Sequence, residues 1–216
     1  MHFDFSSIKP IDRYKLLSST ITPRPIAWVS TIGRDGTLNA APFSFFNVFG
    51  EDPPVLAFAI NSRSIDDLKD TGNNVRFQQE FVVNLVSEEL LEQMNITAIE
   101  FGSDVNEFVE AGLTPAPSTK VRTPRIAESP VSLECRLMMI IELGMARSLV
   151  LGEVLSMHVR PDAVRDQKRF YIETSKLNLV GRMQGNSYVR TSDVMELPRI
   201  SVEAWQAREP TELGTM

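Results

Sequence analysis

Two continuous apolar runs of strand length constrain the fold of this chain more than any other feature. Residues 55–60 read VLAFAI and residues 81–86 read FVVNLV, and turn-forming or polar residues bound both runs. Runs of about six apolar residues are shorter than most helices and are typical of strands that are buried on both faces. We therefore expect a sheet whose central strands are covered on both sides.

Four further segments have strand patterns, and they pair into two hairpins. The turn chemistry of Gly33-Arg34-Asp35-Gly36 predicts the first hairpin, within residues 26–42. The second hairpin is predicted around residues 144–147, between two long strands. In chain order, the predicted strands are residues 26–32, 38–42, 55–60, 81–86, 133–143 and 149–159.

Helical signals are fewer and shorter than strand signals. Ser64, followed three residues later by Asp67, resembles a capping box and predicts a short helix that Gly72-Asn73-Asn74 interrupts or divides. Ser87 precedes two glutamates, which suit the first turn of a second helix. The predicted helical segments are one that leads on from residues 66–71, and residues 88–99, 105–111 and 166–173.

The remaining segments are predicted to be irregular. Residues 113–130 contain four prolines, which favour an extended connector and not a helix. From Arg199 onward the chain is polar and aperiodic, and we expect a tail that is ordered only if it packs on a partner. Because there is no internal repeat and no long linker, we predict one domain over residues 1–198 and a C-terminal tail over residues 199–216.

The balance of strands and helices indicates the fold class. About six strands against two or three short helices differ from the regular alternation of a doubly wound sheet. The sequence contains neither G-x-G-x-x-G nor the phosphate-binding pattern G-x-x-x-x-G-K-[ST]. We expect a mainly β protein, in which a closed or nearly closed antiparallel barrel carries a few short α-helices.

Composition argues against several classes of function. The chain has 22 Lys and Arg against 28 Asp and Glu, a net charge of −6, whereas nucleic-acid binding needs clustered cations. The one cysteine, Cys135, is predicted to be a buried and inert thiol, and two distant histidines argue against a metal site. The N-terminus lacks a signal-peptide pattern, and no apolar run approaches the ~20 residues of a membrane span. We therefore expect a cytoplasmic protein with no membrane and no nucleic-acid partner.

Two segments near the first hairpin contain residues that suit a ligand site. In Thr22-Pro23-Arg24-Pro25 the prolines fix an extended backbone and aim Arg24, although a rigid turn with a solvated Arg is the alternative. Residues 41–47, APFSFFN, offer Ser44, Asn47 and backbone N–H groups beside an aromatic wall. The wall would come from Phe43, Phe45, Phe46 and Phe49. Core packing is the alternative for these rings, and we expect both uses.

A third segment gathers donors that suit an anion. Asn61-Ser62-Arg63-Ser64 would bring hydroxyl, guanidinium and backbone donors to one point, and Lys69 and Thr71 follow closely. These donors suit a terminal phosphate group, because a helix N-terminus and an Arg side chain both favour a bound phosphate. The alternative is a capped surface helix with ordinary charges.

Together these segments resemble the flavin-reductase-like family, whose members have an FMN-binding split barrel of the antiparallel Greek-key type. The match lies in the order and spacing of ITPRPIAWVSTIGRDGTLNAAPFSFFN (21–47), DPPVLAFAI (52–60), LKDTGNNVRFQQEFVVNLV (68–86) and GEV (152–154). It covers roughly residues 8–195. The resemblance implies FMN as the cofactor and a homodimer with FMN near the dimer interface.

The resemblance also implies a role for particular residues. Ser44-Phe45-Phe46-Asn47 would face the flavin ring and its polar edge. The residues implied for the phosphate are Ser62, Arg63, Lys69 and Thr71, with Arg24 assisting. Residues 181–188, which end in Tyr188, are similar to the family's late R-x-x-G-x-x-Y element and would approach the flavin from the second subunit.

One departure from the family pattern leaves the reaction open. Many NAD(P)H-using members carry a His before the second long strand, whereas this chain has Arg147 there, and His158 lies elsewhere and is predicted to be packed or at the surface. The resemblance implies an oxidoreductase that reduces flavin with NADH or NADPH. The alternatives are a flavoredoxin-like protein that retains FMN and passes electrons to a redox partner protein, and a non-redox FMN-binding module.

The long strand over residues 133–143 also indicates a dimer. Residues 137–141 are all apolar, and consecutive residues of a strand point to opposite faces. The outer face therefore needs a cover, from a helix of the same chain or from a partner subunit. Because the predicted helices are short and few, we expect a partner subunit in a two-fold arrangement.

Overall fold

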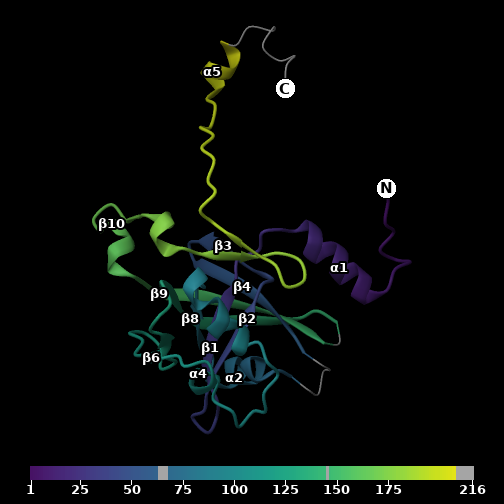
Figure 1. Cartoon of the computed structure of the whole chain (residues 1–216), viewed down its shortest axis with the longest axis vertical. Coiled ribbons are helices and arrows are strands. Elements are labelled where there is room, and N and C mark those ends of the chain that lie inside the picture. Colours follow the sequence, from purple (N-terminus) through teal and green to yellow (C-terminus); the bar gives the residue numbers. More distant parts are fainter. Residues whose placement is uncertain (63–67, 145, 208–216) are drawn as a thin grey trace.

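The computed structural model of the chain describes residues 1–62, 68–144 and 146–207, and its largest element is an antiparallel sheet (Figure 1). The strands of this sheet are β1 (Ala27–Ile32), β2 (Leu38–Phe43), β3 (Phe46–Glu51), β4 (Pro54–Asn61), β5 (Glu80–Asn84), β8 (Val131–Glu142) and β9 (Arg147–Val159). Within the described residues they lie in the order β2-β1-β5-β8-β9-β4-β3, and all neighbours run antiparallel.

The two edge strands of this sheet, β2 and β3, are consecutive in the chain. Only Ser44 and Phe45 join them, and we call these two residues the link. Two residues span less than about 10 Å, so the edges of the sheet must meet at this point. The backbone N–H of Ala59 in β4 also donates to the Phe45 carbonyl, at 2.9 Å. The sheet therefore curls into a barrel that is split between β2 and β3, which confirms the predicted fold class.

The side chains of β1 alternate between two hydrophobic clusters. Ala27 and Val29 join the cluster inside the barrel, whereas Trp28 joins a second cluster on the outside of the sheet. This is the period of two that a strand imposes. Inside the barrel, Gly152 of β9 lies against the Phe81 ring, and a Cβ at this glycine would collide with the ring. The barrel interior is therefore filled by side chains.

Short helices and small two-stranded sheets surround the barrel (Figure 1). The helices are α1 (Pro10–Thr20), α2 (Asp70–Gln78), α3 (Leu91–Ile96), α4 (Glu107–Glu110) and α5 (Val202–Gln206), with 3₁₀ turns η1 (Glu88–Leu90), η2 (Pro161–Ala163) and η3 (Thr174–Leu177). The small sheets pair β6 (Pro115–Ala116) with β7 (Arg125–Ile126), β10 (Val164–Asp166) with β11 (Tyr171–Ile172), and β12 (Val180–Arg182) with β13 (Tyr188–Arg190).

The predicted strands are all present, whereas the helices differ from expectation. The capping box at Ser64 lies outside the described residues, and α2 begins only at Asp70. The helix continues through Gly72-Asn73-Asn74, which the sequence predicted as an interruption. Gly72 and Val75 are buried, and α2 packs on β1, so tertiary packing overrides the low helix propensity of these residues.

Two other predicted helices also need correction. The segment 88–99 is divided into η1 and α3, and the α-helix ends at Ile96. Residues 166–173 are not helical, because β10 and β11 form a hairpin there. Asp166 accepts hydrogen bonds from the backbone N–H groups of Lys168 and Arg169, which favours a turn over a helix.

Several elements were not predicted, among them helix α1 and strand β3. Helix α1 has no side-chain cap, and Pro10 in its first turn is its main local signal. Strand β3 begins at Phe46, so Phe46 and Asn47 lie on a strand and not in the predicted loop. The β3 sequence contains turn-forming Asn47 and Gly50, and its pairing with β4 absorbs them with a register shift between Val48 and Gly50.

Residues 191–207, which we call the arm, leave the barrel after β13 and end with α5 (Figure 1). The root of the arm is fixed, because the Thr191 N–H and hydroxyl donate to the Leu179 carbonyl at 3.2 and 2.9 Å. At its far end, the Ser201 hydroxyl caps α5 by accepting from the Ala204 N–H. The domain boundary predicted at residue 198 lies within this arm and stays a prediction.

No helix in the described ranges is both long enough and apolar enough to cross a membrane. In the same ranges, the His, Cys, Asp and Glu side chains form no group of three that could hold a metal ion. Cys135 is buried in the barrel interior, as predicted, and burial raises the pKa of its thiol.

Candidate functional site

A cavity of about 210 Å³ lies where the link joins the two edges of the barrel. Segments that are far apart in the sequence meet here: α1, the link, the end of β4, the start of α2 and the start of β9. We call this the corner cavity. The residues that line it are Tyr14, Pro42, Phe43, Ser44, Phe45, Ala59, Asn61, Lys69 and Arg147.

The Phe45 ring forms an aromatic wall of the corner cavity with cations beside it. The Tyr14 ring of α1 lies against it, with the ring centroids 6.1 Å apart. The guanidinium carbon of Arg147 lies 5.3 Å from the Phe45 centroid, and that of Arg24 lies 6.0 Å from it. Apolar rings beside fixed positive charge suit a ligand that combines a flat ring with a negative group.

Hydrogen-bond donors gather where the end of β4 lies beside the start of β9. The Arg147 Nη2 donates to the Asn61 side-chain oxygen at 3.3 Å, and the Ser62 N–H donates to the Ala146 carbonyl at 2.8 Å. The Ser62 hydroxyl is buried, and no hydrogen-bond partner for it exists among the described residues. Because buried polar atoms are almost always paired, such a hydroxyl points to a ligand atom as its partner.

Lys69 is the residue before α2, and its side chain lines the corner cavity. The backbone N–H groups of Gly72 and Asn73 bond to the Lys69 carbonyl and start the helix. The N-terminus of a helix favours negative charge through its free N–H groups and its dipole. The ammonium of Lys69 and the α2 N-terminus therefore favour an anion at the same place.

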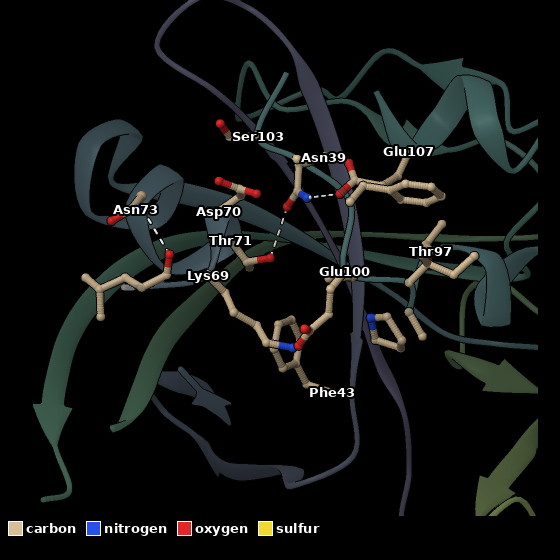
Figure 2. A pocket seen from close by; sticks show the side chains of 17 residues that line it. Asn39, Phe43, Lys69, Asp70, Thr71, Asn73, Thr97, Glu100, Ser103 and Glu107 are labelled. Atoms are coloured by element: carbon tan, nitrogen blue, oxygen red, sulfur yellow. Dashed lines mark hydrogen bonds between the residues drawn. The ribbon is translucent and has the colours of Figure 1, made fainter. Parts of the chain in front are cut away.

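A second cavity of about 580 Å³ also borders Lys69 (Figure 2). Its floor is polar: the Thr71 hydroxyl donates to the Asn39 side-chain oxygen at 3.0 Å, and the Asn39 Nδ2 donates to Glu107 Oε1 at 2.7 Å. Burial raises the pKa of Glu107, and its Oε2 has no hydrogen-bond partner in the described chain. Pro42, Phe43 and Lys69 line both cavities, so we treat the two cavities as one recess.

Arg24 fastens three segments together at the edge of this recess. Its Nη1 donates to the carbonyl oxygens of Ser18 and Ile21 at the end of α1, at 2.6 and 2.8 Å. Its Nη2 donates to the Met183 carbonyl at 2.8 Å, and its Nε faces the Ser44 hydroxyl at 3.4 Å. The sequence predicted that the prolines beside Arg24 aim its side chain, and the structure directs its guanidinium mainly at backbone carbonyl groups. Its assistance to a phosphate stays a prediction.

The structure brings several predicted site residues together. Ser44, Phe45 and Lys69 line the corner cavity, and Thr71 lines the second cavity. Ser62 follows Asn61 directly and lies beside them. The recess therefore contains residues from two of the segments that the sequence singled out, residues 41–47 and the donor segment with Lys69 and Thr71, and Arg24 lies at its edge.

Other predicted site residues lie elsewhere. Phe46 packs against the cluster inside the barrel, and Asn47 is exposed, with its side-chain oxygen accepting from the Val48 N–H at 2.8 Å. Tyr188 packs on the outer cluster beneath the Arg182 guanidinium and lines neither cavity. Arg63 lies outside the described residues, so its predicted phosphate contact stays a prediction.

Three polar side chains that line the corner cavity were not among the predicted site residues. Tyr14 was missed because α1 was missed, and Asn61 was taken only as the start of a donor segment. Arg147 was noted only as a departure from the family's His. Its guanidinium lies over Phe45, so the departure places a cation directly in the site.

Comparisons with known proteins agree with this fold. A sequence model of the flavin reductase like domain matches residues 18–175. An uncharacterised Deinococcus radiodurans protein is 42% identical over 217 residues, which cover 96% of this chain and 95% of that protein.

Two solved structures are similar over nearly their whole length, each with a TM-score of 0.86. The 2-nitrobenzoate 2-nitroreductase NbaA of Pseudomonas fluorescens is 33% identical, over 94% of this chain and 98% of that one. Nitrilotriacetate monooxygenase component B from Bacillus cereus is 30% identical, over 91% of this chain and 98% of that one. Because the domain match covers well over half of the sequence, the chain belongs to the flavin reductase-like family.

Proposed function

We propose that this chain is an FMN-binding oxidoreductase that reduces flavin with NADH or NADPH. The recess at Lys69 carries the proposal, because it combines an aromatic wall with donors for an anion. Phe45 and Tyr14 would contact the flavin ring, and Ser62 and Lys69 would hold the phosphate at the α2 N-terminus. When bound, FMN supplies the redox chemistry, since it accepts a hydride from reduced nicotinamide.

The charges and donors of the recess fit a single terminal phosphate. The chain carries a net charge of −6, so an anionic ligand needs a local positive site. Lys69 and Arg147 supply it within one cavity. The Ser62 hydroxyl, which has no partner among the described residues, adds a neutral donor, and phosphate oxygens accept several such bonds.

The ligand preference gives a direct test. We expect FMN to bind more tightly than FAD in a fluorescence titration, because the adenylate of FAD needs extra room beyond the phosphate. Comparable or tighter binding of FAD contradicts the single-phosphate assignment. A protein that binds no flavin contradicts the proposed function itself.

The names of the two similar solved structures support a redox role over a non-redox module. One is named as a nitroreductase and the other as a component of a monooxygenase. Both are at least 30% identical to this chain over nearly its whole length. Among the candidate functions, we therefore favour an oxidoreductase most and a non-redox flavin-binding module least.

Arg147 favours a second candidate, a flavoprotein that retains FMN and passes electrons to a partner protein. Many NAD(P)H-using members of the resembled family have His where this chain has Arg147, whose guanidinium lies over Phe45 and bonds to Asn61. Stopped-flow bleaching of the bound flavin separates the two candidates. Rapid bleaching by NADH or NADPH supports the first, and bleaching only by dithionite or a reduced protein supports the second.

The proposal includes a homodimer in the cytoplasm, where NADH and NADPH are available. The resembled family holds FMN near its dimer interface, so a second copy would contribute to the recess. Met138, Met139 and Ile141 of β8 are exposed and offer an apolar contact surface. We expect Met139→Asp to be a monomer in sedimentation experiments. Its FMN affinity, measured by fluorescence titration, should be weaker than that of the wild type. A folded monomer with full FMN affinity contradicts a shared site.

A further inference from the structure

The arm carries large apolar side chains that the described structure leaves in solvent. Met195 is 94% exposed and Leu197 is 92% exposed, and both lie on the extended part of the arm. Val194, Ile200, Val202 and Trp205 are also exposed, the last at 51%. Scattered exposed apolar residues are normal, but a continuous series of them marks an interaction surface.

The arm is also built to hold a shape. It contains Pro198 and no glycine, so it differs from a flexible Gly/Ser linker. Thr191 fixes its root to the Leu179 carbonyl, and Ser201 caps the short helix at its end. Within the described residues, the segment 192–200 makes no hydrogen bond to the barrel, and the arm extends away from it (Figure 1).

We propose that the arm packs on the barrel of a second copy of this chain, and that two copies exchange their arms reciprocally. An extended stretch over residues 191–200 reaches roughly 30 Å, enough to cross from one barrel to another. A second copy offers matching surface, because each barrel exposes apolar side chains of its own. These include Ile11, Leu17 and Ile21 on and just after α1, and Met138, Met139 and Ile141 on β8.

Two-fold symmetry favours a second copy of this chain as the partner of the arm. In an isologous dimer both arms and both receiving surfaces are buried together, so one chain supplies every part of the contact. Stable interfaces use about 20–30 residues from each partner, and the arm supplies much of such a set. The exchange does not depend on flavin binding, so its failure would leave the proposed function standing.

Tryptophan fluorescence of the full-length protein tests the exchange. Trp28 is fully buried and donates to the Thr97 hydroxyl, so acrylamide quenching reports mainly on Trp205. We expect Trp205 to be protected at micromolar concentration, where the protein is dimeric. The protection should disappear on dilution, in step with dissociation followed by sedimentation.

Two substitutions in the arm, one at an apolar residue and one at its charged neighbour, test the contact directly. We expect Leu197→Asp to raise the dimer dissociation constant about tenfold or more and to expose Trp205, because a central apolar contact is lost. The neighbouring Glu196→Ala should change the dissociation constant less than about threefold. Circular dichroism checks that both variants remain folded.

Three results would overturn the exchange. The first is Trp205 protection that persists in a monomer, since the arm would then pack on its own barrel. The second is a dimer whose Trp205 stays fully quenchable, and the third is an unchanged dissociation constant for Leu197→Asp.

Discussion

Two buried polar regions of this molecule differ in how fully their hydrogen-bonding groups are used. On β8, Glu134 is fully buried, and it accepts hydrogen bonds from the backbone N–H groups of Thr119, Lys120 and Val121. The Thr119 hydroxyl and the His158 ring nitrogen also bond to this carboxylate. These bonds fasten the connector, residues 113–130, to the outside of the barrel.

The recess beside the link has the opposite character. The Ser62 hydroxyl is buried without a partner among the described residues, and Lys69 and Arg147 both line the corner cavity beside it. Groups that their own chain satisfies stabilise the fold, whereas groups with unused capacity are suited to a ligand. The comparison therefore supports a structural role for the Glu134 cluster and the binding role that we propose for the recess.

Removal of the Glu134 carboxylate should have the largest effect. Glu134→Ala removes the shared acceptor of three backbone N–H groups of the connector and of the Thr119 hydroxyl, so we expect a loss of about 3 kcal/mol in the free energy of unfolding. Urea unfolding of the apoprotein measures it. Glu128→Ala removes an exposed carboxylate that bonds to the Thr114 N–H, and it should cost less than about 1 kcal/mol. Equal losses in the two variants would break the comparison.

Acid should erase the Glu134 contribution in a defined window. Hydrogen bonds from Thr119, Lys120 and His158 outweigh the desolvation by burial and lower the pKa of Glu134 from 4.5 to about 2. Because the folded value is depressed, the contribution is complete above about pH 4.5 and is lost as pH falls toward 2. The stability difference between the wild type and Glu134→Gln should shrink by about 2 kcal/mol across this window, measured by urea unfolding. A difference that does not change with pH would contradict the lowered pKa.

Lys69 tests the binding side of the comparison. We expect Lys69→Gln to weaken FMN binding about tenfold, since a charge-assisted bond to the phosphate is lost, and to leave riboflavin binding unchanged. Unfolding of the apoprotein should be unaffected. Lys176→Gln, which removes an exposed lysine paired with Glu173, is the matched control and should change neither affinity. Equal weakening of both flavins would show that Lys69 does not contact the phosphate.

Ser62 gives the smallest and sharpest test. Because its hydroxyl has no protein partner in the described residues, Ser62→Ala should leave the stability of the apoprotein unchanged or slightly raised. FMN affinity should fall about threefold, as expected for one neutral hydrogen bond. Calorimetry with and without FMN measures both quantities. A clear loss of apoprotein stability would place Ser62 with the structural groups.

The strands were predictable because their signals are local. Apolar runs such as residues 55–60 have the length and composition of buried strands. The turn residues at 33–36 mark the point where the chain reverses direction in a hairpin. By contrast, α2 contains Gly72 in its interior and holds its shape through packing on β1, and β3 holds its shape through pairing with β4. Elements that depend on distant neighbours leave little trace in their own residues.

The site residues also separate into those with a local sequence signal and those that the fold brings into place. Ser44, Phe45 and Lys69 belong to segments with distinctive composition, and the sequence singled them out. Tyr14 and Arg147 reach the cavity only because α1 and the start of β9 are brought there by the fold. The hydroxyl of Ser62 was predicted as a donor, but only the folded structure shows that it has no partner among the described residues.

The two-residue link also restricts how this protein can change in evolution. Surface loops usually tolerate insertions, because a longer loop costs little closure entropy. Ser44 and Phe45 instead close the barrel and line the cavity, so an added residue would shift the register of an edge strand. An insertion scan should therefore spare flavin binding at the turn over residues 33–36 and abolish it at residues 44–45. Variation in ligand preference would then arise from the side chains around the link and from the segments that cover it, and not from its length.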